Sequence, residues 1–145
     1  MILRDLCLDD IDQVCAIEEE AFSMPWHRES FIDMVNNENA LYIVACEGDE
    51  VQGCAGLISV VGEGEICNIV VSCKNRGNGI GHALVKELIA RGRDEYQIGD
   101  FTLEVRKSNI VARKLYESFG FMCEGIRPNF YDKPTEDACI YWLRK

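Results

Sequence analysis

Apolar residues near the N-terminus follow first a strand pattern and then a helix pattern. Residues 1–7 alternate enough to begin a strand, and Asp9 or Asp10 can cap the helix that comes next. A second helix is expected after Ser23, which can cap it, with Pro25 in its first turn and its end near N-N-E-N at 36–39. Apolar positions recur at helical spacing in both: Ile11, Val14, Cys15 and Ile17, then Phe31, Met34 and Val35.

The middle of the chain changes to a strand pattern. Residues 40–47 and 51–61 are two β-rich runs around a turn at 48–50, which predicts an antiparallel hairpin whose second strand Gly53 and Gly56 weaken. Another strand is expected at 65–71. From residue 80 to 90 the period is helical again, with an apolar stripe formed by Ile80, Leu84, Val85 and Leu88.

The last third predicts a strand, a helix and two more strands. Residues 101, 103 and 105 share one strand face, and Thr102 and Glu104 share the other. Ser108 or Asn109 can cap the helix, and Gly120 suits a left-handed stop. The helix carries an apolar side made of Ala112, Leu115, Tyr116 and Phe119. Strands are then expected at 121–126 and 138–143, with a loop at 128–135.

The resulting order, β-α-α-β-β-β-α-β-α-β-β, indicates an α/β (α+β) fold with a mixed central sheet and helices on both faces. A length of 145 residues fits one domain, 1–145. The chain has 15 Lys and Arg and 25 Asp and Glu, which gives a net charge of -10. This charge disfavours binding to nucleic acid and anionic membranes and attracts cations, although a net negative charge can also simply keep a protein soluble. We see no apolar run of membrane-spanning length and no export signal, so a cytoplasmic location is expected.

Eight cysteines raise the question of disulfides or metal. No C-x-x-C occurs, six of the eight lie in apolar segments, and only His27 and His82 could help to bind zinc. We therefore expect small buried free thiols in a reducing compartment, and no metal site.

The segment R-G-N-G-I-G at 76–81 lies between a predicted strand and a predicted helix. Glycines there let backbone amides approach a phosphate at the helix start. The segment lacks the Lys-Ser/Thr pair of a Walker loop, and its spacing does not fit G-x-G-x-x-G. A glycine-rich turn with no ligand is the alternative.

This loop resembles the R/Q-x-x-G-x-G/A pyrophosphate loop of the GNAT N-acetyltransferase superfamily. The segment S-N-I-V-A-R-K-L-Y-E-S-F-G-F at 108–121 is similar to a second block of that superfamily, in the same order and at the usual distance. More narrowly, A-F-S-M-P-W at 21–26, L-E-V-R at 103–106, R-P-N-F-Y at 127–131 and E-D-A at 136–138 resemble the ribosomal-protein alanine N-acetyltransferases. The resemblance covers the whole chain, with Phe130 in place of the usual first tyrosine of N-Y-Y.

The resemblance implies acetyl-CoA as co-substrate and no metal. Asn109 would reach polar atoms of the cofactor, or simply cap its helix. Backbone amides around Ile69, Val70 and Val71 would hold the thioester carbonyl oxygen. The pyrophosphate would bind along the loop formed by Arg76, Gly77, Asn78, Gly79, Ile80 and Gly81.

The resemblance also implies a general base, Glu104, and a general acid, Tyr116. By position alone Glu104 could be a solvated strand residue, and Tyr116 a packed aromatic of its helix. Phe22, Trp26 and Tyr131 would form the acceptor slot, although Trp26 could instead staple the second helix. His27 and His82 have no spaced partner for acid-base work.

The function expected from this resemblance is transfer of acetyl to the N-terminal α-amine of a protein by direct amine attack. The acceptor would be the N-terminal alanine of a ribosomal protein, with a basic segment behind it. Two alternatives stay open: a GNAT enzyme acting on lysine side chains or small-molecule amines, and a catalytically silent acyl-CoA-binding module.

Overall fold

The computed structural model describes residues 1–145 and contains the predicted elements in the predicted order. Short 3₁₀ turns at Leu8–Asp10 and Cys73–Asn75 precede α1 and α3. The elements are β1 (Ile2–Asp5), α1 (Ile11–Ala21), α2 (Arg28–Asn36), β2 (Ala40–Glu47), β3 (Glu50–Val60), β4 (Glu63–Val71), α3 (Ile80–Tyr96), β5 (Asp100–Arg106), α4 (Ile110–Ser118), β6 (Met122–Tyr131) and β7 (Glu136–Leu143).

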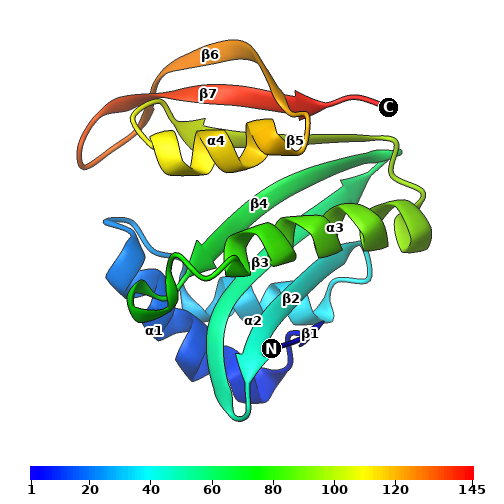
Figure 1. Ribbon diagram of the computed structural model, residues 1–145, viewed down its shortest axis with the longest axis vertical. Helices are drawn as coiled ribbons and strands as arrows, with labels where there is room; N and C mark the ends of the chain where they lie inside the picture. Colours follow the sequence, from blue (N-terminus) through cyan, green and yellow to red (C-terminus); the bar gives the residue numbers. More distant parts are fainter.

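One seven-stranded sheet runs through the molecule in the order β1-β2-β3-β4-β5-β7-β6. Every neighbouring pair is antiparallel except β4 and β5. Those two strands pair in parallel only where residues 63–65 meet residues 100–102. Beyond that point they diverge, and Figure 1 shows β5, β6 and β7 separating from β4. The divergence opens the sheet in the middle of the molecule.

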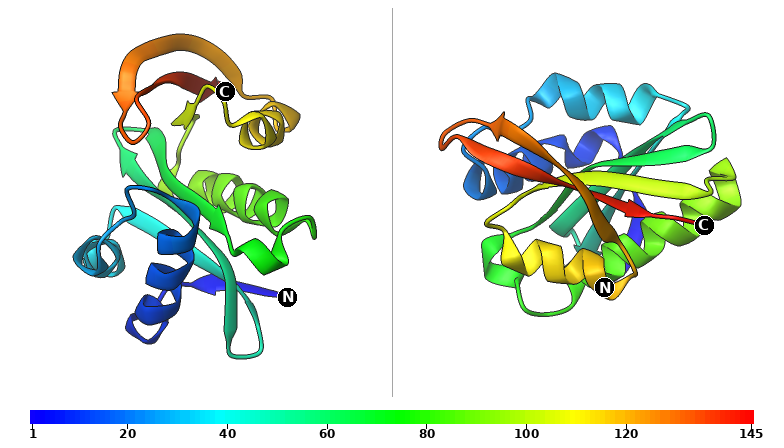
Figure 2. Two further views of the ribbon diagram at one scale, coloured as in Figure 1. Left: turned by 90° about the vertical axis from the view of Figure 1, so that its left-hand side faces the viewer. Right: turned by 90° about the horizontal axis from the view of Figure 1, so that it is seen from above.

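Helices cover both faces of the sheet, which confirms the predicted fold class. In Figures 1 and 2, α1 and α2 lie on one face, and α3 and α4 lie on the other. A separate apolar cluster fills each interface: Val14, Phe31 and Tyr42 pack in the α1–α2 cluster, and Leu84 and Phe101 in the α3–α4 cluster. None of the helices combines the length and the apolar character that crossing a bilayer requires.

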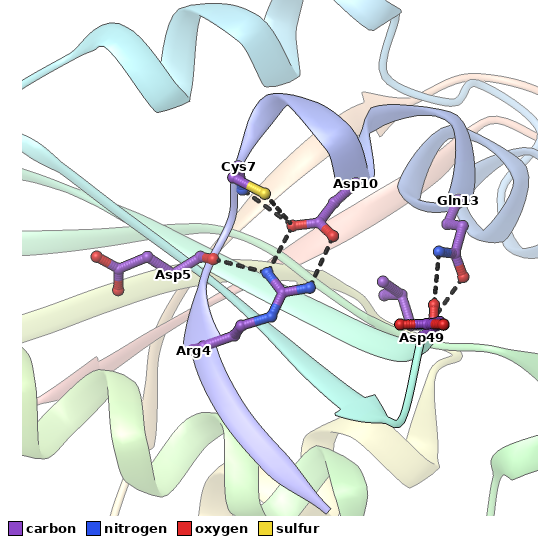
Figure 3. A network of polar contacts seen from close by, with 7 residues as sticks. Arg4, Asp5, Cys7, Asp10, Gln13 and Asp49 are labelled. Carbon is purple, nitrogen blue, oxygen red and sulfur yellow. Dashed lines mark hydrogen bonds and ion pairs between the residues drawn. The ribbon is translucent and has the colours of Figure 1, made fainter.

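The N-terminal strand is tied to the turn before α1 by a buried carboxylate (Figure 3). Arg4 donates two hydrogen bonds of 2.8 Å to Asp10, and the Cys7 backbone N–H donates to the same side chain at 2.9 Å. Asp10 is 3% exposed, and the Arg4 hydrogen bond holds the pKa of its carboxyl below the usual value. The expected capping of α1 by the Asp10 side chain is therefore wrong, since its oxygens face Arg4 and Cys7.

The second helix begins later than its sequence suggests. Ser23 and Pro25 lie in the segment between α1 and α2, and His27, with extended backbone, is the residue before the first helical turn. The Trp26 backbone N–H donates to the Glu18 carboxylate of α1 at 3.3 Å. That tertiary contact holds residues 22–27 as a loop against α1. The local signals, Ser23 as a cap and Pro25 in the first turn, predict that the helix would already have begun in this segment.

The expected loop at 128–135 is also wrong, because β6 continues through Pro128 to Tyr131. Because β6 is the edge strand, it pairs with β7 on one side only, and no regular pair forms between Arg127 and Tyr131. Proline can therefore occupy position 128 without breaking a regular hydrogen bond between strands. An irregular register between Arg127 and Tyr131, with Asn129 at φ +54°, absorbs the misfit. Only residues 132–135 form the turn to β7.

All eight cysteines are free thiols, but they are not uniformly buried. Cys46, Cys54 and Cys139 are core residues, as expected. Cys7, Cys73 and Cys123 are exposed, because they lie in turns or on the edge strand, where an apolar neighbour in sequence does not imply a core position.

Candidate active site

A cleft of about 650 Å³ opens where β4 and β5 separate. Four parts of the chain form its walls: the end of α1 with the segment after it, the diverging strands, α4 with the residues just before it, and the end of β6 with the turn to β7. The cleft brings together seven of the residues proposed from the sequence: Phe22, Trp26, Ile69, Glu104, Asn109, Tyr116 and Tyr131.

Strand β5 places Glu104 on the α1–α2 side of the sheet. Leu103 and Val105 point into the α3–α4 cluster, so the alternation of strand side chains directs Glu104 the opposite way. Its side chain is 25% exposed and lies 3.4 Å from the Arg127 guanidinium, measured from Oε1 to Nη2. A partly exposed carboxylate in the cleft wall can accept a proton from a ligand.

Strand β4 carries a bulge beside the cleft. The pairing with β3 shifts between Gly56 and Leu57, which leaves Cys67 as the extra residue. The Ser72 N–H donates to Gln52 of β3, and antiparallel pairs alternate, so the backbone amides of Ile69 and Val71 face away from β3 toward the gap.

The same alternation turns the Val70 amide toward β3, and the Val70 side chain packs in the α1–α2 cluster. Of the three residues at 69–71, Ile69 and Val71 therefore have amides that can reach a ligand in the gap. A carbonyl oxygen held there would receive backbone N–H donors.

Tyr116 reaches the cleft from the other face of the sheet. It belongs to α4, whose first turn is capped by Asn109 through its side-chain oxygen and the Ala112 N–H at 3.2 Å. The ring packs on Phe121 and Tyr141, and the residue is 8% exposed. Burial raises the pKa of the phenol, and no protein group hydrogen-bonds its hydroxyl. The hydroxyl is therefore a protonated donor that is free for a ligand.

Three aromatic side chains line the cleft. Trp26 packs on Phe31 of α2 with ring centroids 5.2 Å apart, as a staple of that helix would, and it also lines the cleft, while its role toward an acceptor stays a prediction. Tyr131 stands at the end of β6, and burial together with the nearby Glu104 charge raises its pKa to about 12. Phe22 is 40% exposed at the rim.

Arg106, to which sequence reasoning assigned no role, holds in place the cleft wall that is formed by the turn from β6 to β7. Its guanidinium donates to the carbonyls of Asp132 and Pro134 at 2.7 and 2.9 Å and stacks 4.5 Å from the centre of the Tyr131 ring. It also pairs with Glu136 at 3.2 Å. These contacts hold the turn from β6 to β7 against β5.

The loop at 76–81 lies outside the cleft lining, at the start of α3. Gly77 and Gly79 have φ of +82° and +79°, a backbone conformation that is strained for residues with a side chain. No atom lies within 4 Å of the position that a Cβ would take at either residue. The first turn of α3 has no side-chain cap, so its amides are available to an anion. Arg76 donates from Nε to the Val71 carbonyl at 3.2 Å, which anchors it beside the loop.

This loop borders the helix that carries Tyr116. A side chain built at Gly81 would lie 3.4 Å from Leu115 of α4, and His82 stacks on Phe119 at 4.6 Å between ring centroids. The start of α3 therefore lies directly against α4.

Sequence reasoning also missed a buried network of polar side chains in the wall of the cleft. The Asn68 amide donates to Glu18 at 3.0 Å and to the Tyr42 hydroxyl at 2.9 Å, and Tyr42 contacts Cys54. One signal was available: Glu18 stands seven residues after Ile11 on the apolar stripe of α1, where a carboxylate is out of place.

The comparison with known families matches residues 11–121 to the acetyltransferase (GNAT) family. The chain belongs to the GNAT acetyltransferase family. It is 34% identical over 142 residues to a putative [ribosomal protein bS18]-alanine N-acetyltransferase of Bacillus subtilis, covering 97% of this chain and 93% of the relative. The corresponding protein of Haemophilus influenzae is 34% identical over 128 residues, 87% of this chain and 84% of the relative.

Structural comparison agrees with the family assignment of this acetyltransferase. The crystal structure of the ribosomal-protein-S18-alanine N-acetyltransferase from Escherichia coli superimposes with a TM-score of 0.90 at 30% identity, covering 99% of this chain and 92% of that one. GNAT acetyltransferases use acetyl-CoA. The roles of the individual site residues stay predictions.

The two histidines of the acetyltransferase do not line the cleft. His27 precedes α2 and His82 stacks on Phe119. That neither acts as acid or base stays a prediction. No three His, Cys, Asp or Glu side chains converge in an arrangement that could hold a metal ion.

Proposed function

We propose that this acetyltransferase transfers the acetyl group of acetyl-CoA to the N-terminal α-amine of a protein. One observation carries the proposal: Glu104 and Tyr116 enter a single cleft from opposite faces of the sheet. A proton acceptor and a proton donor then flank a reacting carbon between them. The acceptor would come from the α1–α2 side, and the cofactor from the side of α3 and α4.

The cofactor site is formed by the start of α3 and the gap between β4 and β5. Backbone amides from Gly77 to Gly81, with Arg76 beside them, would hold the pyrophosphate. Asn109 lines the cleft, and its side-chain NH₂ is free to bind the cofactor, because capping uses only its oxygen. The cofactor supplies the acetyl group as an activated thioester.

A series of proton and charge movements then completes a direct transfer. Glu104 accepts a proton from the α-ammonium, whose ordinary pKa of about 7.7–8.0 makes that proton easy to remove. The neutral amine attacks the carbonyl carbon, and the Ile69 and Val71 amides stabilise the negative charge that develops on the oxygen. Tyr116 donates a proton to the sulfur as the carbon–sulfur bond breaks, and the attacking nitrogen gives up its second proton, through water, to the Tyr116 phenolate. The products are a neutral amide and a free thiol, and Glu104 returns its proton to solvent.

A protein N-terminus is the acceptor that fits best. Trp26 and Tyr131 both line the cleft, and a slot bounded by these two rings would admit a terminal amine more easily than a side chain branching from the middle of a chain. The net charge of -10 attracts a basic segment behind it. The named relatives are [ribosomal protein bS18]-alanine N-acetyltransferases, which supports an N-terminal alanine of a ribosomal protein as the target.

The test uses two peptides with one sequence that begins with alanine and carries arginines and one lysine downstream. One peptide has a free N-terminus, and its twin is formylated. After incubation with acetyl-CoA, intact-mass analysis should show one acetyl group on the first peptide and none on the second. Acetylation of the blocked peptide at a comparable rate would replace the proposal with lysine acetylation.

A further inference from the structure

Glu18 is a buried carboxylate in the wall of the cleft. The residue is 2% exposed and projects from α1 toward β4, on the same side of the sheet as Glu104. Its Oε1 accepts the Trp26 backbone N–H at 3.3 Å, and its Oε2 accepts the Asn68 amide at 3.0 Å. No Lys, Arg or His forms an ion pair with it.

When it is ionised, the Glu18 carboxyl has no countercharge within the protein. A carboxylate offers about four acceptor sites, and two neutral N–H donors occupy only part of them. Charged groups are rarely buried unless they are paired, because removal from water costs several kcal/mol. Burial raises the pKa of the Glu18 carboxyl against the opposing effect of its two hydrogen bonds, because burial disfavours the ionised form, and a cation beside the carboxyl would stabilise that form.

The surroundings show where such a cation would arrive. Trp26 and Asn68, the two donors to Glu18, line the same cleft. The bulge at Cys67 directs Asn68 toward α1, and Asn68 is itself held by the Tyr42 hydroxyl. The carboxylate is therefore fixed in position before any ligand enters, which lowers the entropic cost of binding.

We propose that the Glu18 carboxylate binds the α-ammonium group of the acceptor as it enters the cleft. This inference rests on the proposed function, because it takes the acceptor to be a chain end. Glu18 anchors the charged amine, and Glu104 then removes the proton that makes it reactive. Glu18 is thus a binding residue that distinguishes a chain end bearing a charged amine from one that is blocked.

The experiment compares Glu18→Gln with the wild type in the binding of two peptides measured by calorimetry. One peptide has a free N-terminal alanine, and the other is its N-acetylated product, which lacks the ammonium. Glu18→Gln should weaken binding of the free peptide by about 10- to 100-fold, the range for hydrogen bonds to charged groups. Binding of the acetylated peptide should change by less than about 3-fold, because it never used the charge.

Glu19→Gln provides the matched control. Glu19 is the next residue of α1, exposed and outside the cleft, so its loss changes the net charge equally without touching the site. It should leave both affinities unchanged. A comparable loss in Glu19→Gln would assign the effect to long-range attraction and would overturn the inference.

A purely structural role of Glu18 gives a different pattern. If the carboxylate only ties Trp26 to β4, the two peptides lose affinity together in Glu18→Gln, and the inference is wrong. If Glu18→Gln fails to fold by circular dichroism, Glu18→Asp replaces it, because aspartate keeps the charge on a shorter side chain. Glu18→Asp should weaken binding of the free peptide more than binding of the acetylated peptide, and an equal loss for both peptides would overturn the inference. If the wild type acetylates peptide N-termini but Glu18→Gln binds the free peptide normally, this inference fails while the proposed function stands.

Discussion

Replacing Tyr116 by phenylalanine removes one oxygen atom and separates catalysis from packing. The hydroxyl makes no hydrogen bond within the protein, and the ring contacts with Phe121 and Tyr141, at 5.9 and 6.4 Å between centroids, are kept. The free energy of unfolding should therefore change by less than about 1 kcal/mol. Loss of a positioned proton donor should slow turnover by about 10²- to 10⁴-fold, or roughly 2.7–5.4 kcal/mol of activation free energy.

The opposite pattern is expected for Tyr96→Phe, which serves as the control. The Tyr96 hydroxyl donates to the Ala40 carbonyl at 3.1 Å, far from the cleft lining, so its loss should lower stability by about 1 kcal/mol and leave turnover unchanged. Rates are measured by chromatography of the acetylated peptide, because the exposed cysteines of the enzyme would react with thiol reagents. Normal turnover in Tyr116→Phe would show that Tyr116 is only a packed aromatic.

The remaining predictions concern the cofactor loop, the base and the N-terminal tie. Gly79→Val should abolish acetyl-CoA binding in calorimetry, whereas Gly48→Val, at a turn residue with φ +58°, adds similar strain elsewhere and should leave binding intact. Glu104→Gln should slow turnover by about 10²- to 10⁴-fold with acetyl-CoA affinity kept, and normal turnover would exclude a base role. Asp10→Asn should cost about 1–3 kcal/mol in urea unfolding at pH 7. Since Arg4 lowers the folded-state pKa of Asp10, that difference should shrink as the pH falls below the ordinary value of 3.8, and a constant difference would contradict the ion pair.

The order of the elements and the face that carries Glu104 could be predicted, because both depend on local periodicity. Alternation in residues 101–105 is visible in the sequence, and β5 has that alternation. The helix limits and the length of β6 depend on contacts between distant residues. Pro25 would suit a helix start, but the contact of Trp26 with Glu18 holds that segment as a loop, and Pro128 is tolerated only because β6 is an edge strand.

Some residues of the candidate site could likewise be predicted from local sequence, and others depend on tertiary structure. Glu104, Tyr116 and the glycine loop were found through local motifs, whereas Glu18 stands in a run of three glutamates that looks like a solvated helix face. Glu18 differs from its neighbours in being buried, because α1 lies against β4 at this point. The bulge in β4 also contributes, and no residue type in the sequence predicts it. Burial of a charge is a tertiary property, so only the apolar stripe of α1 hinted at it.

The most direct test of the whole account is a crystal structure with a conjugate in which the sulfur of CoA is linked to the N-terminal nitrogen of an alanine-initiated peptide. The account predicts pyrophosphate oxygens on the backbone amides of residues 77–81 and the sulfur beside the Tyr116 hydroxyl. The peptide nitrogen should lie within about 2.6–3.2 Å of Glu104 or of one bridging water. A peptide that enters from the α3–α4 side, or a conjugate whose nitrogen lies away from both residues, would contradict the assignment of the cleft.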